Sequence, residues 1–214
     1  VNENDEPYLT PIESTVERLL PILSYEQLIV ISRQVPVDTC RSIFEKIQGA
    51  GKKVNLCYCP ENLRLGNALE GFRKPGRLVF GLSSPEAKAR AEELFEGCEG
   101  ERLHMDLESA EMAKHAMNAY LAMMISFSGE ISDLCEKTGA NALLVMEALR
   151  KEPRVSPQAP LMPGLGFGGG TLARDVQALR MAGRQKGVPT PVMDAALAAN
   201  TARNSYVQRK LQQA

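Results

Sequence analysis

A lysine and an asparagine stand four residues apart in the segment ESAEMAKHAMNAYLA, at Lys114 and Asn118. On a helix this spacing places both side chains on one face, with Glu111 one turn earlier on that face. An ammonium beside an enclosed apolar cavity gives up its proton more readily, and a neighbouring carboxamide can orient a hydroxyl or a water. The pair therefore suits hydride transfer from an alcohol. The alternative is that Lys114 pairs with Glu111 on a solvated face and that Asn118 is a tolerated polar residue.

A second candidate is the segment GLGFGGGTLARD, in which Gly164, Gly166 and Gly169 fit the spacing G-x-G-x-x-G. A dinucleotide fingerprint of this form needs a strand directly before its first glycine. The preceding PQAPLMP excludes a central strand, because proline lacks a donor for the ladder. Two interpretations remain open: bare backbone that lies against a ligand, or a flexible connector before a helix with Thr171 as its N-cap.

The histidines and cysteines carry less information. We expect His104 and His115, which lie beside the Lys114 face, to be ordinary polar residues. The cysteines are odd in number and lie in apolar periodic segments, which is typical of reduced thiols in a cytoplasmic protein; they are Cys40, Cys57, Cys59, Cys98 and Cys135. Cys57 and Cys59 lack the second ligand pair of a zinc site, so no metal is expected.

Composition excludes other classes of protein. The chain carries 25 Lys and Arg against 26 Asp and Glu, a net charge of −1, which offers no field to attract nucleic acid or an anionic membrane. The uncharged run from Ala116 to Gly129 has 14 residues, and a membrane span needs about 20. No signal peptide is visible. Because the chain opens at Val1, we expect it to be part of a longer protein.

The elements that must position these residues fall into two groups. Apolar runs predict strands at residues 28–32, 54–59 and 77–82. A helix is expected between the first two with Asp38 or Thr39 as its N-cap and Gly49 after its last apolar position, and another over 84–95. This order predicts an α/β fold over residues 1–104, the back half of a Rossmann-like parallel sheet.

From Leu107 the pattern changes to one long helix that ends near Gly139. Apolar residues recur on it every seven positions, which predicts a central helix or the core of a dimer; the two series are Ala110, Met117, Met124 and Ile131, and Ala113, Tyr120, Phe127 and Leu134. Shorter helices are expected over 142–150 with Asn141 as cap, from Leu172, and from Thr190 toward Leu211. Residues 105–214 are thus expected to form an all-helical domain.

Three segments together resemble the successive signatures of the UDP-glucose/GDP-mannose dehydrogenase family: PENLRLGNALEGF, ESAEMAKHAMNAYLAMMISFSGEISDLCEKTGA and GLGFGGGTLARD. The resemblance covers nearly the whole chain, from the last strands of the family's NAD domain through its central helical domain. It implies NAD-dependent oxidation of a UDP- or GDP-linked hexose at C6, through an aldehyde to the uronic acid. It also implies a homodimer formed through helix 107–138. The front of the NAD domain and the C-terminal nucleotide-binding domain are not in this sequence, so we expect the chain alone to bind NAD poorly.

The resemblance also implies catalytic roles. Lys114 and Asn118 match the lysine and asparagine that hold the reacting oxygen and a water. Glu61 matches the glutamate near the reacting sugar, and Asp175 matches the aspartate that assists proton transfer. Thr171 stands where the family has a cysteine.

Binding roles follow in the same way. The implied substrate contacts are Asn62, Leu63, Arg64, Gly164, Gly166 and Phe167, the last three from a loop that closes over the substrate. Arg154 looks like the arginine that reaches the sugar nucleotide in the neighbouring subunit. Cofactor contacts are implied for Arg33, Gln34, Val35 and Gly170, although the family more often has Ser-Thr-Val at the first three.

Thr171 is the main departure from the family pattern. The usual loop is G-F-G-G-S-C, and its cysteine attacks the aldehyde so that a second hydride can leave from a thiohemiacetal. A threonine hydroxyl is a much poorer nucleophile at neutral pH. Oxidation through a hydrated aldehyde, a single oxidation that ends at the carbonyl, and loss of activity all remain open. Two other classes stay as alternatives: a β-hydroxyacid dehydrogenase relative and a dimerising scaffold without activity.

Overall fold

The computed structural model describes residues 8–61, 63 and 66–213 and divides into two compact units, Val1–Lys114 and His115–Ala214. The domain boundary expected between residues 104 and 105 stays a prediction. In chain order the elements are α1 (Thr10–Leu19), β1 (Leu28–Ile31), α2 (Thr39–Gly49), β2 (Asn55–Tyr58), α3 (Ala68–Arg73), β3 (Arg77–Leu82), α4 (Pro85–Leu94), β4 (Glu101–Asp106), α5 (Leu107–Thr138), α6 (Ala142–Lys151), α7 (Gly170–Lys186) and α8 (Pro191–Gln213).

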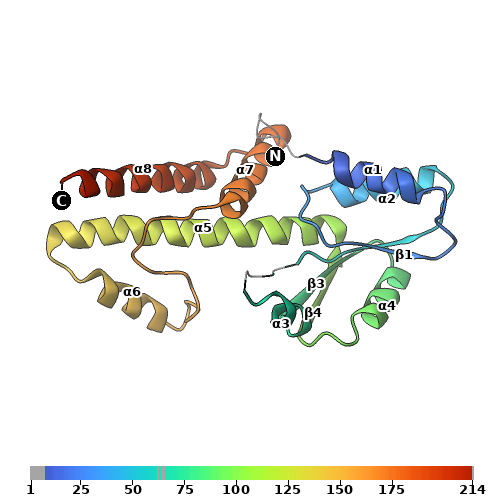
Figure 1. The fold of residues 1–214 in the computed structure, drawn as a ribbon, viewed down its shortest axis with the longest axis horizontal. Coiled ribbons are helices and arrows are strands. Elements are labelled where there is room, and N and C mark those ends of the chain that lie inside the picture. Colours follow the sequence, from blue (N-terminus) through green and yellow to red (C-terminus); the bar gives the residue numbers. More distant parts are fainter. Residues whose placement is uncertain (1–7, 62, 64–65, 214) are drawn as a thin grey trace. The chain divides into compact units, whose positions relative to one another are not determined.

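The first unit is built on a four-stranded sheet in the order β1-β2-β3-β4 (Figure 1). β1 and β2 are parallel, and so are β3 and β4. β2 and β3 are antiparallel, with Tyr58 opposite Gly81. A parallel return between neighbouring strands needs a crossover, usually a helix packed on the sheet, and α3, which lies between β2 and β3, has no buried residue. The expected Rossmann-like sheet is therefore present with one antiparallel step.

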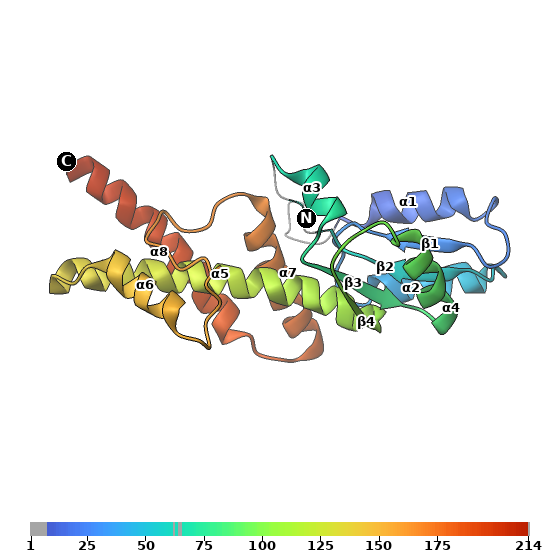
Figure 2. The same cartoon turned by 90° about the horizontal axis from the view of Figure 1, so that it is seen from below.

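Alternate side chains of β2 supply two apolar cores, one on each face of the sheet. Leu56 and Tyr58 belong to the core that α1 and α2 cover. Cys57 and Cys59 belong to the opposite core, which includes Ala91 of α4. Figures 1 and 2 show α4 on the face of the sheet opposite α2. The sheet is thus held from both sides, and this fixes the loops at its edges.

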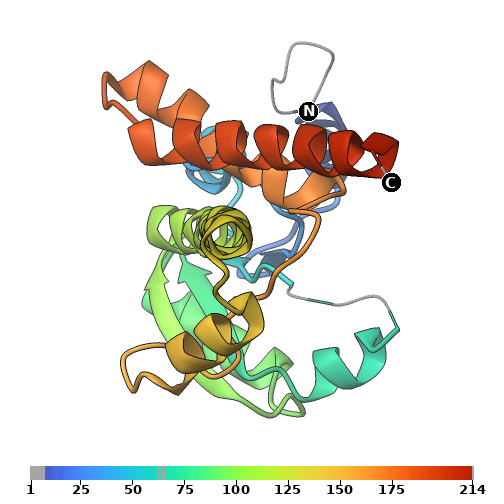
Figure 3. The ribbon, with the colours of Figure 1, turned by 90° about the vertical axis from the view of Figure 1, so that its left-hand side faces the viewer.

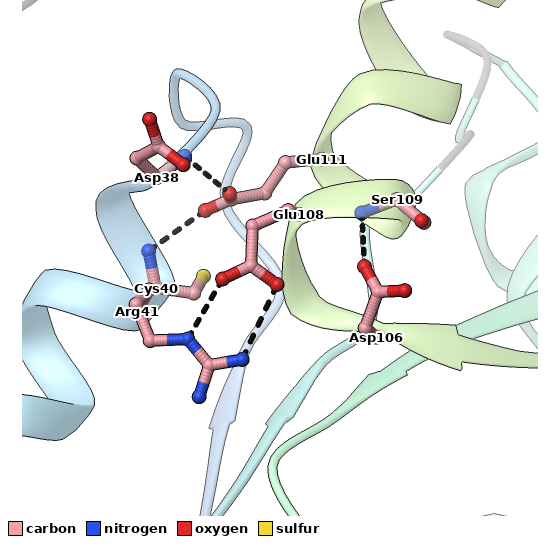
Figure 4. A network of polar contacts seen from close by, with 7 residues as sticks. All are labelled: Asp38, Cys40, Arg41, Asp106, Glu108, Ser109 and Glu111. Atoms are coloured by element: carbon pink, nitrogen blue, oxygen red, sulfur yellow. Dashed lines mark hydrogen bonds and ion pairs between the residues drawn. The ribbon is translucent and has the colours of Figure 1, made fainter.

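A buried carboxylate ties the start of α2 to the first turns of α5 (Figure 4). Glu111 is fully buried, and its two oxygens accept the backbone N–H groups of Cys40 at 2.7 Å and Asp38 at 2.8 Å. These are N–H groups that a helix cannot satisfy internally at its own start. Asp38, an expected side-chain N-cap, has a φ of 75° and makes no side-chain cap. Burial raises the pKa of Glu111 and the two N–H donors lower it, with the balance upward.

Two further contacts fix the start of α5. Glu108 accepts Nε of Arg41 at 2.7 Å and its Nη2 at 3.3 Å, and this pairing lowers the pKa of Glu108. Asp106 caps α5 by accepting the N–H of Ser109 at 2.7 Å, which lowers the pKa of Asp106. The first turns of α5 are therefore anchored by three carboxylates.

The sheet also approaches α5 closely at one glycine. A Cβ atom at Gly81 of β3 would lie 2.6 Å from Cβ of Ala110 and 3.2 Å from Cα of Leu107. No real side chain tolerates such contacts, so only glycine fits here. Leu107 and Ala110 themselves are fully buried in the core of the α2 face.

The second unit is helical, as expected. Figures 1 and 3 show α8 on one side of α5 and α6 on the other. Its core joins Ala119 and Ala122 of α5 to Phe167 and Val176. Ser126 of α5 donates its hydroxyl to the carbonyl of Ala196 in α8 at 3.0 Å. Small residues on this face of α5 let the neighbouring helices pack closely.

The opposite series of apolar residues on α5 faces solvent. Tyr120, Phe127 and Leu134, spaced by seven, are 59%, 47% and 59% exposed. The other series, Met117, Met124 and Ile131, is half-buried. The single chain therefore leaves the predicted seam on its surface.

Several element boundaries differ from those predicted. The sequence did not indicate α1, α3 or β4. β4 reads ERLHMD, and its charged outward residues mask the alternation of an edge strand. α7 begins at Gly170, two residues before the predicted Leu172, and its N-cap is Gly169. Thr171 therefore lies inside the first turn of α7, and the N-cap alternative for this residue was wrong.

The uncharged stretch of residues 116–129 lies within α5. It includes three buried polar side chains, Asn118, Ser126 and Ser128. Across the residues that the structure describes, no helix combines the length and the apolar character that a membrane span needs.

Replacing Glu111 by alanine is expected to lower the free energy of unfolding by about 2–4 kcal/mol, because two backbone N–H groups lose their acceptor. Urea denaturation followed by circular dichroism measures this loss. Glu108→Ala is the matched control on the same helix, since its partly exposed ion pair with Arg41 contributes at most about 1 kcal/mol. Equal losses in the two variants would contradict the anchoring role of Glu111.

Candidate functional site

In the first unit, the candidate residues gather where β1 and β2 end. The N–H of Cys59 donates to the carbonyl of Ile31 at 2.9 Å, and the N–H of Glu61 donates to that of Ser32 at 3.4 Å. These hydrogen bonds continue the parallel pairing of the two chain segments beyond the ends of β1 and β2. They place the Arg33–Val35 turn beside Glu61. Ligands of open α/β sheets bind at the carboxyl ends of parallel strands. Arg33 is exposed, Gln34 is half-buried and Val35 is 1% exposed.

Lys114 lies at this same edge. Its ammonium Nζ donates to the backbone carbonyl of Glu61 at 2.7 Å. The carboxylate of Glu61 accepts the N–H of Leu63 at 2.7 Å, which stabilises the turn after β2. The structure therefore brings together two predicted catalytic residues, Lys114 and Glu61, through the backbone of one of them.

The alternative for Lys114 required Glu111 as a partner on a solvated face. Glu111 is instead fully buried, and its two oxygens accept the first N–H groups of α2. This arrangement removes the solvated pair that the alternative assumed.

The predicted spacing of the lysine and the asparagine is present on one continuous helix. Lys114 and Asn118 both lie in α5, four residues apart, so they are neighbours one turn apart on its surface. Lys114 is the last residue of the first unit, and Asn118 belongs to the second. Asn118 is 5% exposed.

In the second unit, Asn118 contacts the predicted proton-transfer residue. The Nδ2 group of Asn118 donates a hydrogen bond to Oδ2 of Asp175. Asp175 lies on α7 and is fully buried. A carboxylate in such surroundings is costly unless donors or charges pair with it. Asn118 and Asp175 are therefore one structural group, and the catalytic roles that the resemblance implies for them stay predictions.

His115 joins this group, which the sequence did not suggest. Its Nδ1 lies 3.4 Å from Oδ1 of Asp175, and the side chain is only 4% exposed. Nε of Arg174 lies 3.6 Å from the same oxygen. We expected an ordinary polar residue at His115, whereas it is buried against a carboxylate. Its position three residues before Asn118 was the available indication, because side chains at this spacing share a helix face.

The glycine loop is held by α8. Asn200 makes two hydrogen bonds with the backbone of Phe167: its Oδ1 accepts the N–H at 2.8 Å, and its Nδ2 donates to the carbonyl at 3.0 Å. Nε of Arg203 donates to the carbonyl of Gly164 at 2.7 Å. Gly166 has a φ of 93°, and a Cβ there would lie 2.5 Å from Oδ1 of Asn200. The loop that the resemblance describes as closing over the substrate is thus braced in this structure.

The loop leads directly into α7. Gly170 is the first residue of the helix and Thr171 the second, and both are exposed. Thr171 and Asp175 are four residues apart, so they lie on one side of α7. The hydroxyl of Thr171 is therefore on a residue one turn from the buried carboxylate.

The remaining predicted substrate residues are less constrained. The side chain of Arg154 is 87% exposed and its Nε donates to Glu152 at 2.7 Å, which lowers the pKa of Glu152. Leu63 is 42% exposed. Asn62 and Arg64 lie outside the described residues.

The cysteines are all free thiols, and four of the five are buried. Burial raises the pKa of Cys57 to about 12 and that of Cys59 to about 11. A thiol with a pKa in this range is almost fully protonated at neutral pH and is a weak nucleophile. Among the described residues, no cluster of three or more His, Cys, Asp or Glu could hold a metal ion.

Comparison with known proteins assigns the two parts of the chain to two domains of one family. Residues 1–99 match the NAD binding domain of the UDP-glucose/GDP-mannose dehydrogenase family, and residues 108–202 match its central domain. UDP-glucose 6-dehydrogenase of Rickettsia conorii is 30% identical over 207 residues, covering 96% of this chain and 48% of that protein. UDP-N-acetyl-D-mannosamine dehydrogenase of Methanococcus maripaludis is 30% identical over 167 residues, covering 78% of this chain and 38% of that protein.

Solved structures agree with this assignment. A UDP-glucose dehydrogenase from the hyperthermophilic archaeon Pyrobaculum islandicum superposes with a TM-score of 0.87 at 28% identity, covering 94% of this chain and 48% of that one. The chain spans about half the length of the curated relatives it matches. Two adjoining domains of one family are matched in order and over most of the chain. The chain therefore belongs to the UDP-glucose/GDP-mannose dehydrogenase family.

Proposed function

We propose that the protein to which this chain belongs oxidises a nucleotide-linked hexose at C6, with NAD as the hydride acceptor. The observation that carries this proposal is the hydrogen bond from Asn118 to the buried carboxylate of Asp175, with Lys114 one turn away on the same helix. Relatives are named for UDP-glucose and for UDP-N-acetyl-D-mannosamine. The substrate class is thus a sugar nucleotide, and a panel of UDP- and GDP-hexoses would identify the hexose.

The carboxyl ends of β1 and β2 fit a role in holding NAD. Arg33 and Gln34 leave the sheet where a cofactor binds in open α/β folds, and both have accessible surface. The buried side chain of Val35 fixes the turn that presents them. When bound, NAD supplies the acceptor for the hydride that leaves C6.

The chain's own residues handle the proton and the oxygen. Loss of hydride from an alcohol carbon requires the hydroxyl proton to leave, and a positioned base lowers the barrier to this step. In our proposal the ammonium of Lys114 stabilises the negative charge that develops on the reacting oxygen. Asn118 orients this oxygen or a neighbouring water, and Asp175 assists removal of the proton. One such step converts CH₂OH to CHO and transfers two electrons.

We further propose that the reaction proceeds without a covalent intermediate. Thr171 stands in the first turn of α7, where a thiol would be needed to attack the aldehyde. A threonine hydroxyl is a much poorer nucleophile than a thiol at neutral pH and is not expected to form the adduct from which a second hydride leaves. The proposed reaction is therefore a single noncovalent two-electron oxidation.

The exposed seam of α5 supports a homodimer. Tyr120, Phe127 and Leu134 form an apolar stripe at heptad spacing on a helix of 32 residues. Such a stripe can pack on its own copy across a two-fold axis, because each residue then meets the same surface that it presents. A second copy of this chain is the occupant that we propose for it.

Lys114→Met in the full-length protein is expected to lower kcat by about 100- to 10,000-fold, because the reacting oxygen loses its charged partner. Formation of NADH, followed by absorbance with the sugar nucleotide that the wild type accepts, measures the rate. Lys137→Met, at an exposed position in the last turn of the same helix, is the control and should retain the wild-type rate. A Lys114 variant within about threefold of wild type would argue against the assigned role.

Thr171→Cys is expected to restore the second oxidation, because a thiol in the first turn of a helix is partly ionised and can attack the aldehyde. In the full-length protein the yield of NADH per sugar nucleotide should rise from about one to about two. Mass spectrometry should show the product change from the aldehyde or its hydrate to the uronate. Thr171→Ser is the matched control and should keep the wild-type product. Uronate formed by the wild type as fast as by the cysteine variant would exclude the single-step reaction.

Phe127→Glu is expected to convert the chain from dimer to monomer, because it places a charge in the centre of the apolar seam. Sedimentation velocity of the 214-residue chain measures the change. Leu94→Glu introduces the same charge at a side chain that is 61% exposed on α4 and should leave the dimer intact. A wild-type chain that sediments as a monomer at all concentrations would rule out the seam as a self-association surface.

A further inference from the structure

The carboxylate of Asp175 has defined neighbours at both of its oxygens. Oδ2 accepts Nδ2 of Asn118, and Oδ1 lies 3.4 Å from Nδ1 of His115 and 3.6 Å from Nε of Arg174. Asp175 is fully buried. The free energy of a carboxylate out of water depends on such partners, and they also influence which way it faces.

The two neighbours at Oδ1 differ in their surroundings. The side chain of His115 is 4% exposed, whereas that of Arg174 is 41% exposed. Interactions of an exposed guanidinium are weakened by water, while those of a buried imidazole act at low effective dielectric. His115 is therefore the stronger constraint on Oδ1.

His115 and Asn118 reach Asp175 from one helix. They are three residues apart on α5, and this spacing puts their side chains on adjoining positions of one face. One helix face thus contacts one carboxylate at both oxygens. Such a two-point contact fixes the plane of the carboxylate, which a single contact would leave free to rotate.

We propose that His115 is a positioning residue for Asp175, whose Nδ1–H is directed at Oδ1 while Asn118 holds Oδ2. In this arrangement the ring keeps its proton on Nδ1, because the tautomer of a histidine is set by the partner of each nitrogen. The oriented anion is then available to assist proton removal in the proposed oxidation, on which this inference rests. His115 acts through Asp175 and does not itself touch the sugar.

The tautomer of His115 can be measured on the chain without substrate. The sequence contains two histidines, so a long-range ¹H–¹⁵N correlation of histidine-labelled protein yields two ring systems, and His104→Gln assigns them. The expected result is a proton on Nδ1 of His115, and loss of this preference in Asp175→Ala. A proton on Nε2 in the wild type, or an unchanged pattern in Asp175→Ala, would overturn the proposal.

Kinetics of the full-length protein provide the second test. His115→Phe removes the donor and is expected to lower kcat by about 10- to 100-fold with little change in KM, since a charge-assisted hydrogen bond is lost at the carboxylate and not at the substrate. His115→Asn keeps a donor near the position of Nδ1 and should recover most of the rate. His104→Gln should have the wild-type kcat. A merely structural histidine would predict equal effects of the Phe and Asn variants, or a loss that follows their melting temperatures.

The two tests separate this inference from the proposed function. If the tautomer is as expected but no sugar nucleotide is oxidised, the contact with Asp175 stands and the proposed activity fails. If sugar nucleotides are oxidised but His115 carries its proton on Nε2, the activity stands and the positioning role fails.

Discussion

A carboxylate taken out of water must find donors, and this constraint shapes both units of the chain. Glu111 and Asp175 are each fully buried. Glu111 meets the requirement with two backbone N–H groups at the start of α2. Asp175 accepts a hydrogen bond from Asn118, and Nδ1 of His115 lies 3.4 Å from its other oxygen. Helix α5 takes part in both cases, as the carrier of the acid in the first and of the donors in the second. The register of α5 is therefore fixed by polar contacts that tolerate little displacement, and Lys114 lies between them in the sequence.

The spacing of apolar and polar residues along the chain predicted the long helix and its exposed apolar series. The long helix was expected to end near Gly139 and ends at Thr138, and the heptad series of Tyr120, Phe127 and Leu134 is on its surface. Local caps were predictable for the same reason: Asn141 accepts the N–H groups of Leu143 and Leu144 at the start of α6. In each case the interacting residues lie within a few positions of one another, so their spacing in the sequence is enough to predict the contact.

Contacts between distant segments were not predictable in this way. Helical spacing puts Glu111 near Lys114. The carboxylate of Glu111 instead accepts the backbone N–H groups of Asp38 and Cys40, which are more than 70 residues away in the sequence. The partner of His115 is Asp175 on another helix, and Phe167 is held by Asn200, 33 residues further along the chain. The antiparallel pairing of β2 and β3 was not predictable for the same reason. It depends on whether α3 packs on the sheet, and the sequences of the two strands do not specify this. The spacing of residues on a helix predicts which side chains share a face. It does not predict which distant segment of the chain packs against that face.

In the proposed reaction, the two oxidation steps depend on different side chains near the start of α7, Asp175 and the residue at position 171. The base assignment rests on Asp175, whose surroundings come from α5 and are independent of the residue at 171. The nucleophile rests on a single side chain in the first turn of α7, where the exposed hydroxyl has room to vary. Removal of a hydride and a proton from an alcohol needs the first group, and covalent capture of the aldehyde needs the second. In the proposed reaction, a chain that keeps the buried group and changes the exposed one therefore retains the residues for the first oxidation and lacks the nucleophile for the second.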